Sequence, residues 1–120
     1  MRTIQPRVTV AAIALAAMAT ACSLGAPSAP APPAGPAVSG DQTVMLTNGG
    51  AFDPNGLRIT SGTTVTWRWD DGSTLHNVTF DDFGSDTQTQ GTYAHTFDEA
   101  GTFPYVCTLH PNMTGTVVVE

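Results

Sequence analysis

Short apolar runs, each closed by a turn signal, occupy the chain from Asp41 to its end. The runs are rich in β-branched and aromatic residues, and Val65, Trp67 and Trp69 recur at every second position. This two-residue period is that of a strand with one buried face, and no window shows a sustained helical period. The expected strands are 44–46, 57–59, 63–69, 76–80, 92–97, 102–107 and 115–119.

Seven short strands at close spacing predict an all-β domain, built as an antiparallel sandwich or barrel. The acidic and polar stretch 81–91 is the expected long loop. The predicted domain, 41–120, is near the lower end of sizes that fold without a disulfide or a metal. Cys107 is the only cysteine in it, so no disulfide is available within the domain. A metal site would explain the unpaired thiol and stabilise the fold.

One short loop carries three side chains that bind soft metals. Two residues separate Cys107 from His110, and two more separate His110 from Met113. A His₂Cys site with a weak axial methionine is the geometry of blue-copper electron-transfer centres. Alone, the cysteine or the methionine would indicate ordinary packing, but the three together favour copper. Pro111 restricts the backbone of His110 and helps to fix the loop.

The loop lacks a second imidazole, which only His76 or His95 can supply. His76 lies where an acidic turn meets an expected strand, whereas His95 lies mid-strand between Tyr93 and Phe97. A mid-strand histidine flanked by aromatic residues is more often a packing or surface residue than a ligand. The place of each histidine relative to the expected strands therefore favours His76 over His95 as the second imidazole ligand.

Other sites fit these residues less well. Structural zinc needs four Cys or His ligands, and a thiolate-bridged copper pair needs two cysteines on the loop. The carboxylates Asp81, Asp82 and Asp86 do not match the spacing of an EF-hand. A nucleophilic pair of Cys107 and His110 would share one tight loop with no substrate domain beside it. These arguments disfavour zinc, calcium and a thiol enzyme.

The N-terminus resembles an export signal. Arg2 and Arg7 precede an apolar run over 8–18, which is too short to span a bilayer, and small residues follow at 19–21. This pattern predicts a lipoprotein signal peptide over 1–21 with Cys22 as the lipidated first residue of the mature chain. The alternative is ordinary secretory cleavage after Ala21, which would give a soluble periplasmic or secreted protein.

A Pro/Ala-rich stretch follows and predicts an extended tether over 22–40. The chain has no lysine, and without the signal it keeps Arg58 and Arg68 against ten carboxylates. Such a charge disfavours nucleic acid as a partner. It would steer basic partners or simply provide solubility, and both interpretations stay open.

Several motifs are shared with a known family. They are Phe52-x-Pro54, Gly62-x-x-Val65-Thr66-Trp67, His76-Asn77-Val78, Thr96-Phe97-x-x-Ala100-Gly101-Thr102, Tyr105-x-Cys107-x-x-His110-x-x-Met113 and Gly115-Thr116-Val117-Val118-Val119-Glu120. Together they resemble the plastocyanin/azurin family of cupredoxins over about 42–120, and the short loop is similar to that of amicyanin. Trp69 stands where that family usually has asparagine.

The resemblance implies a Greek-key sandwich or barrel of about seven to eight strands that binds one copper ion. It carries over His76, Cys107, His110 and Met113 as the ligands. It also implies that the backbone N–H of Asn77 donates a hydrogen bond to the Cys107 sulfur and tunes its potential.

The expected function is type 1 copper electron transfer by an exported, lipid-anchored carrier, not an enzyme, in the periplasm or on the outer face of the cell membrane. The expected partners are redox proteins such as a c-type cytochrome, an oxidase or a dehydrogenase, and the domain is expected to be monomeric. His110, beside Leu109, Pro111 and Leu75, is the expected electron port. The alternative is a copper-binding or copper-delivery lipoprotein. Delivery would favour exposed Met or His clusters, which the sequence lacks outside the site.

Overall fold

The computed structural model describes residues 33–120, so the predicted signal peptide, Cys22 and most of the predicted tether lie outside the described residues. The described part forms seven strands. They are β1 (Gln42–Thr47), β2 (Ala51–Asp53), β3 (Gly56–Ile59), β4 (Thr63–Trp69), β5 (Gly91–Phe97), β6 (Gly101–Val106) and β7 (Thr114–Val119). Residues 33–120 contain no helix long and apolar enough to cross a membrane.

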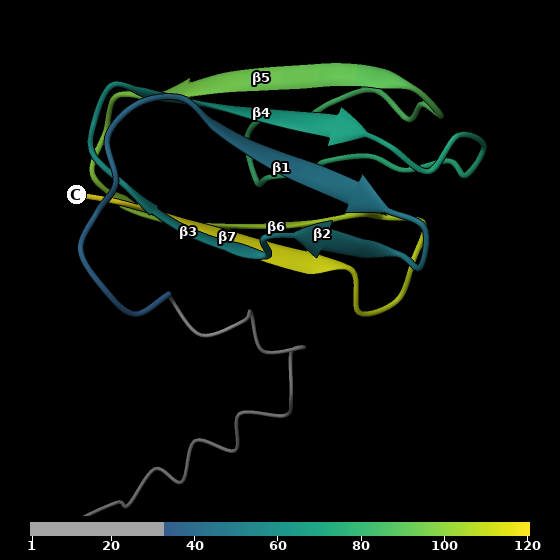
Figure 1. Cartoon of the computed structure of the whole chain (residues 1–120), viewed down its shortest axis with the longest axis horizontal. Helices are drawn as coiled ribbons and strands as arrows, with labels where there is room; N and C mark the ends of the chain where they lie inside the picture. The colour runs from purple at the N-terminus through teal and green to yellow at the C-terminus, as the bar shows by residue number, and fades with distance from the viewer. Residues whose placement is uncertain (1–32) are drawn as a thin grey trace, which may run out of the picture.

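The strands form two packed sheets, which Figure 1 shows as two layers. One sheet has the order β2-β1-β4-β5 and the other has the order β3-β7-β6. β2 pairs with the end of β1 and also contacts β7 of the second sheet, so it connects the layers along one side. The all-β sandwich predicted from the sequence is confirmed.

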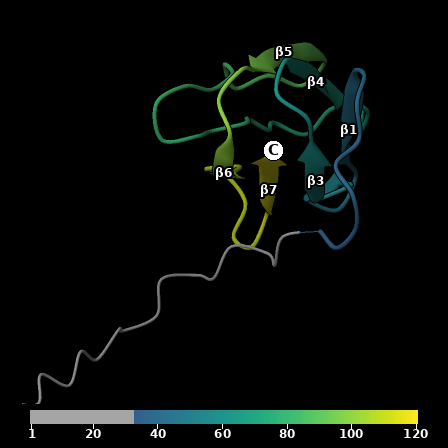
Figure 2. The same cartoon turned by 90° about the vertical axis from the view of Figure 1, so that its left-hand side faces the viewer.

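Both sheets are mixed, whereas the strand pattern predicted antiparallel pairing. β1 pairs parallel with β4, and β3 pairs parallel with β7. In both cases the intervening chain visits the other sheet before it returns, and such a crossover permits a parallel neighbour. The view along the strands in Figure 2 shows β3 and β7 side by side beneath β4 and β5.

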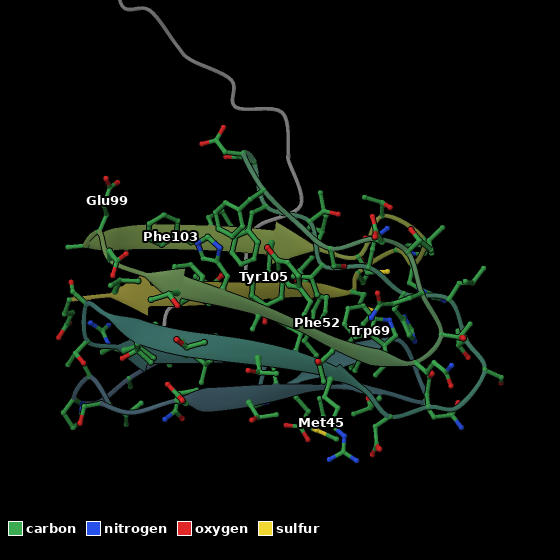
Figure 3. The ribbon with its side chains drawn as sticks, turned by 90° about the horizontal axis from the view of Figure 1, so that it is seen from above. Met45, Phe52, Trp69, Glu99, Phe103 and Tyr105 are labelled. Atoms are coloured by element: carbon green, nitrogen blue, oxygen red, sulfur yellow. The ribbon has the colours of Figure 1, made fainter. Side chains whose placement is uncertain are left out.

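Aromatic side chains fill the space between the sheets. Trp67 of β4 is fully buried, and four other aromatic rings lie with their centroids 5.4–6.4 Å from its own. Figure 3 shows Phe52 and Tyr105 in the middle of this core, and their rings meet edge to face at 4.7 Å. Each such ring buries a large apolar area, so this cluster is a main source of the stability of the domain.

The segment 76–80 was predicted as a strand but forms only isolated bridges. His76 pairs with Gln88, and Thr79 pairs with both Gly84 and Val106. Because each bridge uses a different neighbour, no continuous ladder forms. The bridge to Val106 nevertheless ties this segment to the end of β6, one residue before Cys107, and so brings His76 towards the cysteine.

Ordered contacts begin upstream of Asp41, where the domain was predicted to start. Val38 bridges Ile59, with hydrogen bonds from its N–H to the Arg58 carbonyl (2.9 Å) and from the Thr60 N–H to its carbonyl (3.0 Å). This short stretch thus covers part of the β3 edge.

Candidate metal centre

The loop between β6 and β7 is closed by its own backbone. The Cys107 N–H donates to the Met113 carbonyl (3.0 Å), and the Met113 N–H donates to the His110 carbonyl (3.3 Å). Asn112 adopts a left-handed φ of 67°, which asparagine tolerates better than most residues. These bonds and Pro111 hold seven residues in one compact turn, so the side chains on it have little freedom to separate.

The second histidine is held by three backbone contacts. The N–H and the carbonyl of His76 each bond to Gln88, both at 3.0 Å. The Trp69 indole N–H also donates to the His76 carbonyl (3.1 Å). The sequence marked Trp69 as part of the alternating strand pattern and as a departure from the family pattern, and the structure shows that its indole also fixes the backbone of a site residue.

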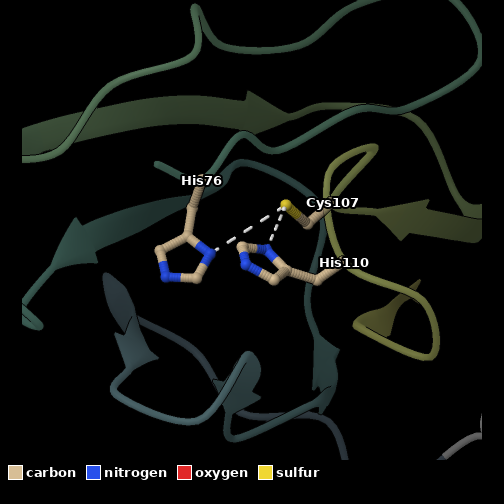
Figure 4. Close-up of side chains that lie close together, drawn as sticks. All are labelled: His76, Cys107 and His110. Carbon is tan, nitrogen blue, oxygen red and sulfur yellow. Dashed lines mark hydrogen bonds between the residues drawn. The ribbon is translucent and has the colours of Figure 1, made fainter. Parts of the chain in front are cut away.

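The structure brings His76, Cys107 and His110 together, as Figure 4 shows. Cys107 Sγ lies 4.0 Å from His76 Nδ1 and 3.5 Å from His110 Nδ1. One donor atom from each residue falls within 4.8 Å of the others. Two ligands bound to one metal at about 2.0–2.3 Å lie about 3.5 Å apart in trigonal or tetrahedral sites, so the spacing is close to that of a formed centre. One thiolate and two imidazoles are a donor set that suits copper.

Burial differs among the residues around the centre. His76 is fully buried and Cys107 nearly so, whereas His110 is half-buried. Met113 is buried as well. It lines the same pocket in the loop as Cys107 and His110, and the volume of this pocket is about 460 Å³. The cluster of His76, Cys107, His110 and Met113 fits a type 1 copper site, in which Met113 would hold the metal together with the other three residues.

The side chain of Asn77 ties the two parts of the centre together. Its amide donates to the hydroxyls of Thr108 (2.7 Å) and Thr87 (3.1 Å). Its carbonyl oxygen accepts from the Thr108 N–H and the Thr79 hydroxyl, both at 3.0 Å. The expected bond from the Asn77 backbone N–H to the Cys107 sulfur remains a prediction. The side-chain network, which sequence reasoning missed, links the residue after His76 to the residue after Cys107.

Sequence reasoning also missed Asp71. Its Oδ2 lies 2.5 Å from His76 Nε2, and neither side chain has exposed surface. Burial raises the pKa of the Asp71 carboxyl, but the hydrogen bond and electrostatic interaction with His76 and the hydrogen bonding of Thr74 together outweigh burial, so that the pKa is lowered. The only signal in the sequence was an acidic pair shortly before the histidine, and acidic pairs are common in solvated turns.

His95 lies apart from the centre. Its ring stacks on Phe83, with centroids 3.9 Å apart and planes 11° apart. Burial lowers the pKa of His95, and the nearby charge of Asp98 opposes this change. Among residues 33–120, the His, Cys, Asp and Glu side chains that lie close enough together to hold a metal ion are those of His76, Cys107 and His110.

Comparisons with known proteins agree with this geometry. The sequence matches the family described as a cupredoxin-like domain over residues 10–119. Halocyanin of Natronomonas pharaonis is 42% identical over 93 residues, which cover 67% of this chain and 57% of halocyanin. Amicyanin-alpha of Methylorubrum extorquens is 34% identical over 117 residues, which cover 91% of this chain and 95% of that protein.

A solved structure of an amicyanin variant in its Cu(I) form shares the fold. It has a TM-score of 0.61 and 32% identity, over 67% of this chain and 82% of the amicyanin chain. Amicyanins thus resemble this chain in sequence and in structure. The chain belongs to the cupredoxin-like family.

Proposed function

We propose that this protein is a type 1 copper electron carrier. The observation that carries the proposal is the convergence of one thiolate and two imidazoles beside a buried methionine. His76, Cys107, His110 and Met113 would hold the metal with two imidazoles, one thiolate and one thioether. Copper bound there would supply the one-electron Cu(II)/Cu(I) couple. The protein would act as a carrier and not as an enzyme.

The role of the chain would be to keep one geometry in both oxidation states. The β6–β7 loop is closed by backbone bonds, and Asn77 fastens it to the segment that carries His76. A site that is already rigid reorganises little when an electron arrives or leaves. Burial of Cys107 also keeps water away from the thiolate.

The surface beside His110 would be the place where electrons enter and leave. Leu75 and Leu109 are large apolar side chains that are 52% and 47% exposed. Such side chains form short-lived contacts with a partner, while charges outside the contact steer its approach. The acidic surface would favour redox partners with a basic face, such as a c-type cytochrome, an oxidase or a dehydrogenase.

An enzymatic role would require more metal ligands than the chain offers. The sequence has three histidines, and the one outside the cluster, His95, stacks on Phe83. A second copper centre would need more histidines, and only His95 is left over for it. Copper delivery without redox turnover is the competing proposal, and the spectrum described below distinguishes the two.

We also propose that the carrier is exported and anchored through a lipid on Cys22. Support comes from the basic start, the short apolar run and the small residues before Cys22. Mass spectrometry of the mature N-terminus tests this part. A lipid-modified Cys22 supports the anchor, and an unmodified N-terminus after Ala21 would instead indicate a soluble periplasmic or secreted protein.

The visible spectrum of the domain starting after Cys22 tests the main proposal. Titration with Cu(II) should produce an intense blue band that saturates at one equivalent and bleaches reversibly with ascorbate. A pale product that does not bleach would contradict electron transfer and favour copper delivery.

A further inference from the structure

Asp71 is a buried carboxylate in the turn between β4 and His76. Its side chain has no exposed surface, whereas that of its neighbour Asp70 is 54% exposed and pairs with Arg68. An ionised carboxylate loses much solvation free energy when it leaves water, unless a hydrogen-bonded partner compensates. The position of Asp71 therefore calls for a partner, and the structure offers one.

That partner is the imidazole of His76. Asp71 Oδ2 lies 2.5 Å from Nε2. Thr74 lies near enough to help lower the pKa of Asp71, yet no group among the described residues meets hydrogen-bond geometry with Oδ1. The bond to His76 is thus the well-formed hydrogen bond that holds this carboxylate in the interior.

The bond selects one form of the imidazole. A neutral histidine carries a proton on one ring nitrogen and a lone pair on the other. A carboxylate is an acceptor, so it favours the proton on Nε2. The lone pair is then left on Nδ1, the nitrogen that faces Cys107 Sγ at 4.0 Å. Only a lone pair can bind a metal ion.

We propose that Asp71 is the positioning residue for His76: it holds the ring in the Nε2–H form and in the orientation that aims Nδ1 at the metal. This inference rests on the proposed function for the identity of the metal. Its geometric part, the tautomer and orientation of the ring, holds for the metal-free protein as well. The negative charge of Asp71 would also strengthen His76 as a donor and favour Cu(II) over Cu(I).

Two substitutions separate position from charge. Asp71→Ala removes the acceptor, so copper affinity should fall about 10- to 100-fold, as for other residues behind a metal-binding histidine. Asp71→Asn keeps an acceptor oxygen but loses the charge. It should retain the tautomer and the blue band, and its reduction potential should rise above that of the wild type. Asp70→Asn is the matched control, because it removes the same charge one residue away from an exposed position.

The first measurement is ¹⁵N NMR of the metal-free protein, which reports the protonated nitrogen of each histidine. Wild type and Asp70→Asn should show His76 as the Nε2–H tautomer, and Asp71→Ala should lose this preference. The second is copper affinity by competition, together with the reduction potential of each variant.

The outcomes separate this inference from the proposed function. If the wild type forms no blue centre, electron transfer fails while NMR still decides the role of Asp71. If the wild type is blue but Asp71→Ala keeps the tautomer and the affinity, the positioning role is overturned. If Asp71→Ala does not fold, the wild type and Asp71→Asn decide: metal-free wild type with His76 in the Nδ1–H form overturns the proposal, whereas the Nε2–H form, with a larger rise in potential for Asp71→Asn than for Asp70→Asn, supports it.

Discussion

The two histidines of the cluster are held in opposite ways. His76 is fully buried, its backbone is bonded to Gln88 and Trp69, and its far nitrogen meets Asp71. His110 is half-buried on the loop, and among the described residues no ion pair holds its ring. The turn after β1 lies beside it, since a Cβ at Gly50 would be 3.7 Å from the ring.

This difference predicts that the two histidines have different roles in the proposed carrier. The buried side, made of His76 and the groups bonded to it, would fix the geometry, because both the ring and the backbone of His76 have hydrogen-bond partners. The open side, made of His110 and its loop, would exchange electrons, because His110 is only half-buried and its neighbour Leu109 is exposed. The comparison predicts that equivalent changes on the two sides have unequal consequences.

Replacing each histidine with glycine should give the largest effect. Both variants should lose the blue band when copper is added. External imidazole should restore it in His110→Gly, because the gap opens to solvent. Imidazole should not restore the blue band in His76→Gly, because the gap left by the His76 ring is enclosed. This variant also leaves Asp71 as a buried charge without its partner. Loss of that partner should lower the free energy of unfolding by about 3–5 kcal/mol.

Absorption titrations with copper and imidazole, and denaturant unfolding, measure these effects. His95→Gln is the matched control, because it removes the histidine that stacks on Phe83 outside the cluster. It should keep the blue band without added imidazole. Equal rescue of His76→Gly and His110→Gly would contradict the proposed difference between the two sides.

The strands of the fold were largely predictable because their residues alternate. β4 carries Val65, Trp67 and Trp69 on its buried face, as the two-residue period requires. The three-residue β2 is too short to show a period, and it forms because it can pair with the end of β1. The parallel pairs were not predictable from local patterns, because they depend on which sheet the chain visits between two strands.

The cluster was predictable for a different reason. Three of its residues lie on one short loop, so sequence spacing alone brings Cys107, His110 and Met113 together. The groups that support them were not predictable. Asp71 and the side-chain bonds of Asn77 depend on how the turn after β4 packs against the loop, and polar residues in turns are ordinary in sequence.

Asn77 provides a second test of the comparison between the two histidines, because its side chain connects the segment of His76 to the loop of His110. Asn77→Ala removes four hydrogen bonds and leaves several partners in the interior without a bond. The free energy of unfolding should fall by about 3 kcal/mol. Copper affinity should fall too, because the loop is no longer fastened to the segment of His76. Denaturant unfolding and copper competition measure the two effects.

Thr87→Val is the control for this network. It removes only the bond from Asn77 to Thr87 and leaves both bonds to Thr108. The free energy of unfolding should fall by about 1 kcal/mol, and copper affinity should stay close to that of the wild type. If both variants bound copper equally, the connection between the two sides would have no role in the site.

The last prediction concerns a loss of stability that appears only at high pH and comes from Tyr105 of β6, two residues before Cys107. Its ring packs against Gly115 of β7, where a Cβ would come within 2.2 Å of it. Burial raises the pKa of Tyr105 to about 12, and the Trp67 indole partly opposes this rise. The ordinary value is 10.0, so the folded state holds this proton more tightly than the unfolded state.

Stability from this group is therefore complete below pH 10 and is lost as the pH rises towards 12. The loss should reach about 2–3 kcal/mol. Denaturant unfolding between pH 8 and pH 12 measures it, and Tyr105→Phe should remove this part of the pH dependence. Tyr93→Phe is the control, since burial also raises the pKa of Tyr93. If Tyr105→Phe kept the full alkaline loss of stability, the buried phenol of Tyr105 would not be its source.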